Sequence, residues 1–467
     1  MGSGSSSSSS SSSCILNSRL PRLLCPARFS PRLLVLYCFI FLAVIALLGS
    51  RMHFGSYFSA VLYGLPVLAQ AQGQDQGSAS APTASSNTAG PVDPFKTYTI
   101  RAENITATLI PYGARLTSVL VPDRDGNQQD VVVGYDDPRN YLKDTETSHT
   151  FFGAVVGRYA NRIKNGSFTL DKKKYQVPAN ENDGLDTLHG GNVGYDQRNW
   201  TVTTHSESTI TFSLLDQGLE DFPGDIITHA TFTVDTSQTV NNPDGLPQLT
   251  TKLVSLALTQ KTPIMLSNHI YWNLNAFKKQ NILEDTYLQL PLSKRYIGTD
   301  EHSVPNGTIL DVDSTYNGSP DFTTGKLVSS DIQDAKGLCG TDCTGYDNCF
   351  IIDRPPQSAA QDSLVSILYA NSSTTGISLE VTSNQQAVQI YACPGQDGSI
   401  PIKPSQEKRN GGDGAKNVNK YGCLVIEPEG WIDGINHPEW GQLPYQVYAP
   451  DTAPAVNWAT YRFGTIQ

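Results

Sequence analysis

Basic residues are scarce in this chain relative to acidic ones. Lys and Arg number 33 against 44 Asp and Glu, so the 467 residues carry a formal net charge of −11. A nucleic-acid-binding protein needs a basic surface that replaces the counterions on phosphate, and this composition argues against that class. The charge instead suits a soluble protein that acts on neutral or cationic ligands.

Motifs for nucleotide and metal binding are also missing. The chain contains neither a G-x-G-x-x-G loop nor a Walker-type loop, and its cysteines and histidines lack the spacing of a zinc site. We therefore expect no cofactor and no metal, and any catalysis must come from titratable side chains.

A long hydrophobic repeat of 3.6 residues is absent as well. Apolar and polar residues instead alternate in short segments at residues 104–110, 114–121, 200–205, 209–215, 226–234 and 249–258. Turn-forming residues are common, with 39 Gly and 28 Pro. This pattern predicts an all-β fold, a large antiparallel β-sandwich, in place of βαβ units.

The N-terminal region differs in composition from the rest of the chain. Residues 3–13 are almost all Ser, and several arginines precede an apolar run at residues 33–49. That run has the length of a short membrane span, which would make a type II signal anchor. Alternatively, translation starts at Met52 and a signal peptide ends at the cleavage pattern Ala69-Gln70-Ala71.

Both interpretations lead to the secretory pathway and give the same domain organisation. We expect a targeting segment at residues 1–71, a flexible linker at 72–93 and one folded domain at 94–467. The protein is expected to be secreted, or held at a membrane by the N-terminal anchor alone. No membrane contact is expected for the folded domain.

Glycosylation motifs and cysteines agree with secretion. N-x-[ST] motifs occur at Asn104, Asn165, Asn199, Asn306, Asn317 and Asn371. Five of the eight cysteines lie in the predicted domain, and an odd number leaves at least one of them without an intramolecular partner. Cys339 and Cys343 lie in one Gly-rich stretch, and we expect them to pair.

Three segments place a titratable residue beside apolar strand residues. They contain His189, which precedes two glycines, His269 and Glu427. Taken singly, each has a plain structural interpretation: a turn histidine, a hydrogen-bonded core histidine and a strand-end carboxylate. Arg158 and Arg162 could likewise form surface ion pairs.

The joint occurrence of these segments changes the interpretation. The motifs are GRYANRI at 157–163, LHGG at 188–191 with GYDQRNW at 194–200, SNHIYWNL at 267–274, GYDNCF at 345–350, VQIY at 388–391 and EPEGWIDGINHP at 427–438. In this order, over roughly residues 95–467, they resemble the aldose 1-epimerase (galactose mutarotase) family.

The resemblance implies a β-sandwich of the galactose-mutarotase type, with a sugar bound in an open cleft on one sheet. It implies that Glu427 is the general base, that His269 is the general acid at the ring oxygen, and that His189 binds the sugar and helps to place the proton donor. The residues that would hold the sugar hydroxyls are Asn161, Arg162, Asp347 and Gln389. The implied partner is a small-molecule sugar.

The chemistry of anomer exchange needs one base and one acid. The C1 hydroxyl of a free sugar loses a proton while the ring oxygen gains one, the ring opens to an aldehyde, and it recloses on the other face. A carboxylate and an imidazole suit these two tasks near neutral pH. An aromatic side chain commonly covers the apolar face of a sugar ring, and Trp272 and Trp431 are candidates.

The sequence therefore favours a cofactor-independent isomerase that interconverts the α and β anomers of free hexoses such as glucose and galactose. Two other functions stay open. An epimerase for a phosphorylated hexose would need a basic cluster for the phosphate. A non-catalytic carbohydrate-binding protein could use the same fold, but it would need no acid–base pair.

The chain departs from the family pattern directly after Glu427. The family commonly has Thr-Gln there, whereas this chain has Pro428-Glu429. Residues i and i+2 of a strand share a face, so Glu429 would lie beside Glu427 and raise the pKa of one of the two carboxyls. A proline cannot continue a paired central strand, so Pro428 could instead break that geometry. Both outcomes are consistent with the sequence.

Overall fold

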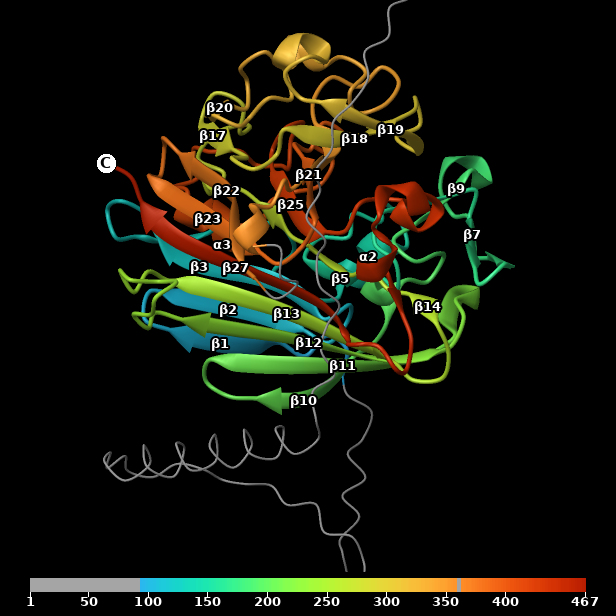
Figure 1. Ribbon diagram of the computed structural model, residues 1–467. Helices are drawn as coiled ribbons and strands as arrows, with labels where there is room; N and C mark the ends of the chain where they lie inside the picture. The colour runs from blue at the N-terminus through green and yellow to red at the C-terminus, as the bar shows by residue number, and fades with distance from the viewer. Residues whose placement is uncertain (1–92, 359–362) are drawn as a thin grey trace, which may run out of the picture. The chain divides into compact units, whose positions relative to one another are not determined.

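The computed structural model describes residues 93–358 and 363–467 (Figure 1). The predicted targeting segment at 1–71 and residues 72–92 of the predicted linker lie outside the described residues. Within the described ranges, regular structure is almost entirely β-strand, with short α-helices α2 (Asn140–Thr145) and α3 (Pro404–Arg409). The predicted all-β fold is confirmed. Over these same ranges, no helix has the length and apolar character that crossing a bilayer requires.

The largest sheet has nine antiparallel strands. In spatial order they are β10 (Thr201–His205), β11 (Thr209–Gln217), β12 (Asp225–Asp235), β13 (Gln248–Ala257), β27 (Ala455–Thr465), β23 (Ile377–Ser383), β22 (Val365–Ser372), β17 (Thr286–Gln289) and β20 (Lys326–Leu327). Figure 1 shows β10 to β13 side by side along the lower edge of the view. The C-terminal strand β27 thus lies in the middle of the sheet and joins its two halves.

A second sheet of six strands carries most of the family-like motifs. Its order is β16 (Tyr271–Trp272), β25 (Leu424–Glu429), β24 (Ala387–Tyr391), β21 (Asp347–Ile351), β18 (Arg295–Thr299) and β19 (Pro305–Asp311). Figure 1 shows β18, β21 and β25 in the upper half of the view.

Smaller sheets complete the architecture. One has four strands, β1 (Tyr98–Ala102), β2 (Ile105–Ile110), β3 (Arg115–Pro122) and β4 (Gln128–Asp130). The two-stranded sheets pair β5 (Ala154–Val156) with β15 (Ser267–His269), β6 (Arg162–Lys164) with β9 (Asp186–Leu188), β7 (Ser167–Leu170) with β8 (Lys173–Gln176), and β14 (Thr262–Pro263) with β26 (Val447–Tyr448).

The alternation seen in the sequence corresponds to burial in the sheets. Along β12, every second side chain from Ile226 to Val234 is buried, and the side chains between them are partly exposed. On the outer face, Thr209 and Thr211 of β11 exchange hydroxyl hydrogen bonds with Thr233 and Thr231 of β12. Side chains in a strand point alternately to its two faces, which explains why a period of two identified these strands.

The main core lies between the six-stranded and nine-stranded sheets. Phe350, Val388, Ile390 and Ile426 belong to one buried cluster with Leu379, Val381 and Tyr461 of the larger sheet. Trp272 joins this cluster and packs on Tyr461, with 5.1 Å between the ring centroids. One face of the six-stranded sheet is therefore filled with apolar side chains, and the opposite face is available for polar residues.

The cysteines of the domain form two disulfides. Cys339 pairs with Cys343, as predicted, and Cys393 pairs with Cys423 across a 30-residue separation. Cys349 is a buried free thiol, which confirms that an odd number of cysteines leaves one unpaired.

Candidate active site

A cavity of about 270 Å³ opens over the polar face of the six-stranded sheet. All seven predicted site residues line it: Asn161, Arg162, His189, His269, Asp347, Gln389 and Glu427. These residues come from segments that are up to 266 positions apart, so the fold brings them together as the resemblance implied.

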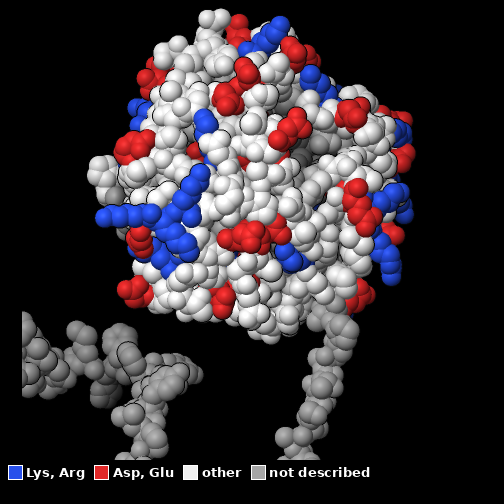
Figure 2. Space-filling model, turned by 90° about the vertical axis from the view of Figure 1, so that its right-hand side faces the viewer, with Lys and Arg blue, Asp and Glu red and all other residues white. Residues whose placement is uncertain are grey.

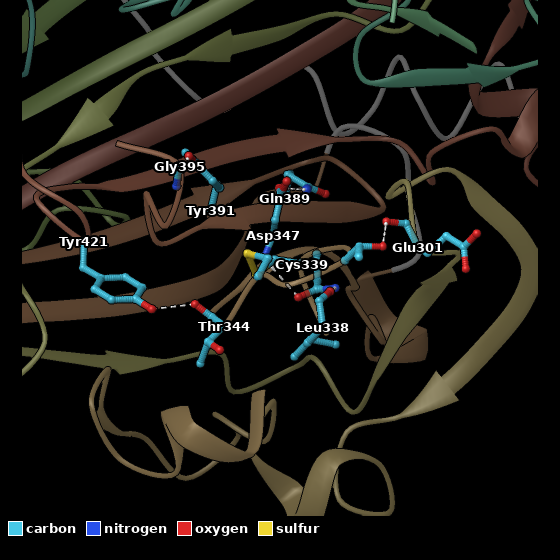
Figure 3. The surroundings of a disulfide bond; sticks show 12 residues. Glu301, Leu338, Cys339, Thr344, Asp347, Gln389, Tyr391, Gly395 and Tyr421 are labelled. Carbon is cyan, nitrogen blue, oxygen red and sulfur yellow. Dashed lines mark hydrogen bonds between the residues drawn. A yellow bond between two sulfur atoms is a disulfide. The ribbon is translucent and has the colours of Figure 1, made fainter. Parts of the chain in front are cut away.

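The register of three central strands places the carboxyl and amide groups on one face. Gln389 of β24 lies directly opposite Glu427 of β25, and Tyr391 lies opposite Asp347 of β21. Directly opposite residues in an antiparallel pair point to the same side of the sheet. Gln389 Nε2 donates a hydrogen bond of 2.7 Å to Asp347 Oδ1 (Figure 3). Gln389 Oε1 has no partner among the described residues, so it is free to accept from a ligand hydroxyl.

His269 and Glu427 meet at the base of the cavity. His269 is supplied by β15 and Glu427 by β25, and His269 Nε2 lies 3.4 Å from Glu427 Oε1. The main-chain carbonyl of His269 accepts a hydrogen bond from Gly153 N–H, which fixes the backbone that carries the imidazole. The two groups therefore face one cavity and can reach neighbouring oxygens of a single small molecule.

Burial disfavours charge on both members of this pair. It raises the pKa of Glu427 well above its ordinary value, and the nearby Glu429 and Asp347 carboxylates raise it further. It lowers the pKa of His269 to about 3. Together, the two groups are most stable with a single proton between them, because that state has no net charge whichever partner holds it.

His189 lies beside this pair with a defined tautomer. Its Nδ1 accepts a 3.2 Å hydrogen bond from the main-chain N–H of Asn161, so the ring proton is on Nε2. Burial lowers the pKa of His189 well below its ordinary value, and the neighbouring His269 and Arg162 lower it further. His189 is thus a neutral imidazole that can donate from Nε2.

Arg162 lines the cavity and forms an ion pair with Glu181. Its Nε and Nη2 donate to Glu181 Oε2 and Oε1 at 2.7 and 2.9 Å, and Asp186 Oδ2 lies 3.7 Å from Nε. Its Nη1 donates to Asn161 Oδ1 at 3.4 Å. A bidentate pair fixes the guanidinium plane, so Arg162 is held rigidly with most of its charge compensated. Arg158, in contrast, is buried away from the cavity in an ion pair with Asp216, so the interpretation of a surface ion pair is wrong for it.

The aromatic residues at the cavity differ from those predicted. Trp272 is buried in the main core and Trp431 packs among Ile297, Ile351 and Ala387, and neither lines the cavity. The aromatic side chains that do line it are Phe151, Tyr271 and Tyr391. Tyr391 lies two residues from Gln389 on one strand, so strand periodicity applied to the VQIY motif could have identified it.

Phe151 contacts three imidazoles. Its ring centroid lies 4.0 Å from His149, 4.7 Å from His189 and 5.6 Å from His269. His149 lines the cavity and its Nε2 lies 2.9 Å from Asp196 Oδ2. His149 lies outside every motif, so the sequence offered no signal for it.

Four residues that line this cavity have strained backbones. His149, Phe151, Asn161 and His189 have φ values of 47°, 59°, 56° and 48°, in the left-handed region that non-glycine residues seldom adopt. Each such residue costs of the order of 1–3 kcal/mol, and such residues cluster at functional sites where the surrounding structure holds them.

Pro428 does not interrupt β25. It pairs in register with Val388 of β24, and Glu427 and Glu429 on either side pair with Gln389 and Ala387. The Pro428 carbonyl accepts hydrogen bonds from Ser267 Oγ and Asn457 Nδ2, on the edge of β25 that faces away from β24 and beyond the last residue pair with β16. The missing N–H therefore faces side chains and costs no ladder hydrogen bond with β24, so Glu429 lies on the same face as Glu427.

The comparisons with known proteins identify the family of this chain. The family model described as aldose 1-epimerase matches residues 96–447. A probable aldose 1-epimerase of Arthroderma benhamiae is 56% identical over 397 residues, which cover 83% of this chain and 90% of that protein. Galactose mutarotase of Mus musculus is 29% identical over 75% of this chain and 89% of its own length.

A solved structure of a related protein has the same fold as this chain. The crystal structure of a GalM/aldose epimerase homologue from C. elegans superposes with a TM-score of 0.64 at 26% identity, and it covers 80% of this chain and 99% of that one. The matched region contains every predicted site residue, and the chain belongs to the aldose 1-epimerase family.

Proposed function

We propose that this protein is an aldose 1-epimerase that interconverts the α and β anomers of free hexoses such as glucose and galactose. The observation that carries the proposal is the contact between His269 and Glu427 in a cavity that also presents amide, carboxylate and guanidinium groups.

Ring opening requires two proton transfers at adjacent oxygens. Glu427, as carboxylate, takes the proton of the C1 hydroxyl, and His269, as imidazolium, gives its proton to the ring oxygen as the C1–O5 bond breaks. The pair reacts in its ion-pair form, carboxylate and imidazolium, which contains the same single proton as the uncharged form that burial favours. It ends as carboxylic acid and neutral imidazole, so its proton count is unchanged. Reclosure on the other face of the carbonyl reverses both transfers and restores the starting pair.

The remaining polar groups position the sugar. On one wall, hydrogen-bond acceptors are provided by Gln389 Oε1 and Asp347, and donors by Arg162. On another wall, His189 offers its Nε2–H as a donor. Phe151, Tyr271 and Tyr391 supply apolar surface for the C–H face of the ring. This mixture suits an uncharged polyol.

The charges at the cavity weigh against a phosphorylated substrate. Arg162 is the one arginine or lysine among the residues that line the cavity, and Glu181 and Asp186 already balance its charge. Acidic side chains are spread over the face shown in Figure 2, with basic ones among them. A phosphate dianion would also meet Asp347 and Glu427 at the cavity floor.

Polarimetry with freshly dissolved α-D-glucose and α-D-galactose tests the proposal. We expect the optical rotation to relax faster than in buffer, in proportion to enzyme concentration. An unchanged relaxation rate together with saturable sugar binding by calorimetry would identify a carbohydrate-binding protein and refute the enzyme.

We also propose that the chain enters the secretory pathway. Two disulfides support this, because such bonds persist in oxidising compartments. Five of the six glycosylation motifs have exposed asparagines, at Asn104, Asn165, Asn199, Asn306 and Asn317, and Asn371 is half-buried.

We expect N-glycosidase treatment of the native protein to lower its mass. N-terminal sequencing of the mature chain separates cleavage after Ala71 from retention of residues 33–49 as an anchor, and a full-length protein without glycans in the cytosol would contradict both.

A further inference from the structure

Two carboxyl groups lie side by side on the face of β25 that carries the reaction. Glu427 lines the cavity, and Glu429, two residues further on, lies behind it and outside the cavity wall. The side chains of Glu427 and Glu429 are 2% and 0% exposed. Strand residues i and i+2 share a face, so the two carboxyls are neighbours. Because both are buried, water does not screen the repulsion between two negative charges here.

The hydrogen bonds around the two groups are incomplete for two carboxylates. Glu429 Oε1 accepts a 3.0 Å hydrogen bond from Asn161 Nδ2, while Glu429 Oε2 and Glu427 Oε2 have no partner among the described residues. A buried carboxylate oxygen without a donor is costly, whereas a protonated carboxyl needs fewer donors.

The groups packed around Glu429 provide little compensating charge. Asp347 and Cys349 face it from β21, Tyr159 faces it from the segment before β6, and Arg162 faces it from β6. The hydroxyl of Tyr159 donates to Gln446 Oε1, so it is not available to Glu429. Arg162 is the cation of this group, and it is already engaged by Glu181.

We propose that Glu429 is a positioning residue for the reaction: its carboxyl group shares a single negative charge with Glu427 and so makes Glu427 a stronger base towards the C1 hydroxyl. This inference rests on the proposed epimerase activity. Burial raises the pKa of Glu429 to about 8, although the Asn161 hydrogen bond and Arg162 oppose this rise. The family's common Gln at this place could make the same hydrogen bond with Asn161 but would carry no charge.

The test compares pH profiles of kcat/KM for glucose in the wild type and in Glu429→Gln. Gln keeps the shape of the side chain and its acceptor for Asn161, so the fold and the KM are expected to stay unchanged. Removing the neighbouring carboxyl lets Glu427 ionise more easily, and the acidic limb of the profile should move to lower pH by about one unit or more. The maximal kcat should fall a few-fold, because a base of lower pKa is weaker.

Glu207→Gln is the matched control. Glu207 is exposed in the turn between β10 and β11, and its substitution removes the same charge at a distance from the cavity. Its profile should coincide with the wild type. If Glu429→Gln does not fold, Glu429→Met carries the same test, because it is similar in length and uncharged.

Two results would overturn the inference. An acidic limb that stays in place in the folded Glu429→Gln variant would show that Glu429 does not act through its charge. Complete loss of activity in that folded variant would show that Glu429 itself takes the proton. A wild type inactive on every aldose would instead refute the proposed function, so the two failures are distinguishable.

Discussion

Single residues in this site work by sharing protons. The His269–Glu427 contact of 3.4 Å holds one proton in a buried pair, and each half of the reaction moves it from one partner to the other. The backbones of Phe151, Asn161 and His189 beside that pair are strained, and the surrounding structure holds them in these conformations. Substitution of either member of this pair should therefore lower the catalytic rate strongly.

Glu427→Gln and His269→Asn should each lower kcat by about 10²–10⁴-fold, the usual contribution of a general acid or base. Both substitutions keep the approximate shape of a buried side chain, so we expect near-wild-type thermal unfolding by circular dichroism. Polarimetric rates measure the loss. A variant that keeps wild-type kcat would remove its residue from the mechanism.

Phe151→Ala should raise the KM for glucose about tenfold. The ring supports His149, His189 and His269 and presents apolar surface to the cavity, and an aromatic contact of this kind contributes about 0.5–1.5 kcal/mol. Phe151→Tyr is the control, because it keeps the ring and should keep the KM. If the alanine variant binds glucose as well as the wild type does, the ring has no part in recognition.

Glu429 should also affect how stability depends on pH. In the folded protein burial raises its pKa to about 8, whereas an unfolded Glu titrates at about 4.3. Between these values the folded state binds the extra proton, so stability falls as the pH rises through this window. The melting temperature of Glu429→Gln relative to the wild type should therefore increase from pH 4 to pH 8. A difference that is the same at both pH values would contradict the raised pKa.

At the scale of elements, the segment between Cys393 and Cys423 reaches the cavity at one residue. The disulfide closes its two ends, and Gln396 within it lines the cavity. Lys403, at the start of α3, anchors the middle of the segment under the four-stranded sheet. Its Nζ donates to Asp130 Oδ2 at 2.9 Å and to the carbonyls of Thr117 and Val132, in a fully buried position.

Lys403→Met should destabilise the protein by about 3–5 kcal/mol, because it leaves the buried Asp130 carboxylate without its cation. Urea unfolding measures the change. Lys416→Met is the matched control in the same segment, since Lys416 is half exposed and its pair with Glu407 should contribute no more than about 1 kcal/mol. If both variants lost the same free energy of unfolding, the burial of Lys403 would have no effect on stability.

The elements also show which features the sequence could predict. Period-two alternation identified strands such as β12, because burial on one face imposes that pattern directly. The resemblance carried by the ordered motifs identified seven of the fifteen residues that line the cavity. The sequence left open whether Pro428 interrupts its strand. It does not, because its nitrogen faces away from β24, at a point beyond the last residue pair between β25 and β16.

On the scale of the whole molecule, long-range packing determines which side chains face the cavity and which face the core. Local sequence patterns do not predict this. Trp272 and Tyr271 are neighbours in one motif, yet Trp272 fills the core between the sheets and Tyr271 faces the cavity. Their sequence context does not distinguish the two faces, because only the pairing of β16 with β25 sets the orientation. His149 reaches the cavity through its contact with Asp196, and no local signal marks that contact.

The net charge of −11 and the acidic floor of the cavity together predict discrimination against anionic sugars. A hexose 6-phosphate carries a dianion that the compensated Arg162 cannot neutralise, and the field of the whole molecule repels it. We expect kcat/KM for glucose 6-phosphate to be at least about tenfold below that for glucose, which corresponds to about 1.4 kcal/mol. Because salt screens charge, added NaCl should raise the value for the phosphate while leaving that for glucose unchanged. Equal kcat/KM values for the two sugars at low salt would contradict this and would favour a phosphorylated substrate.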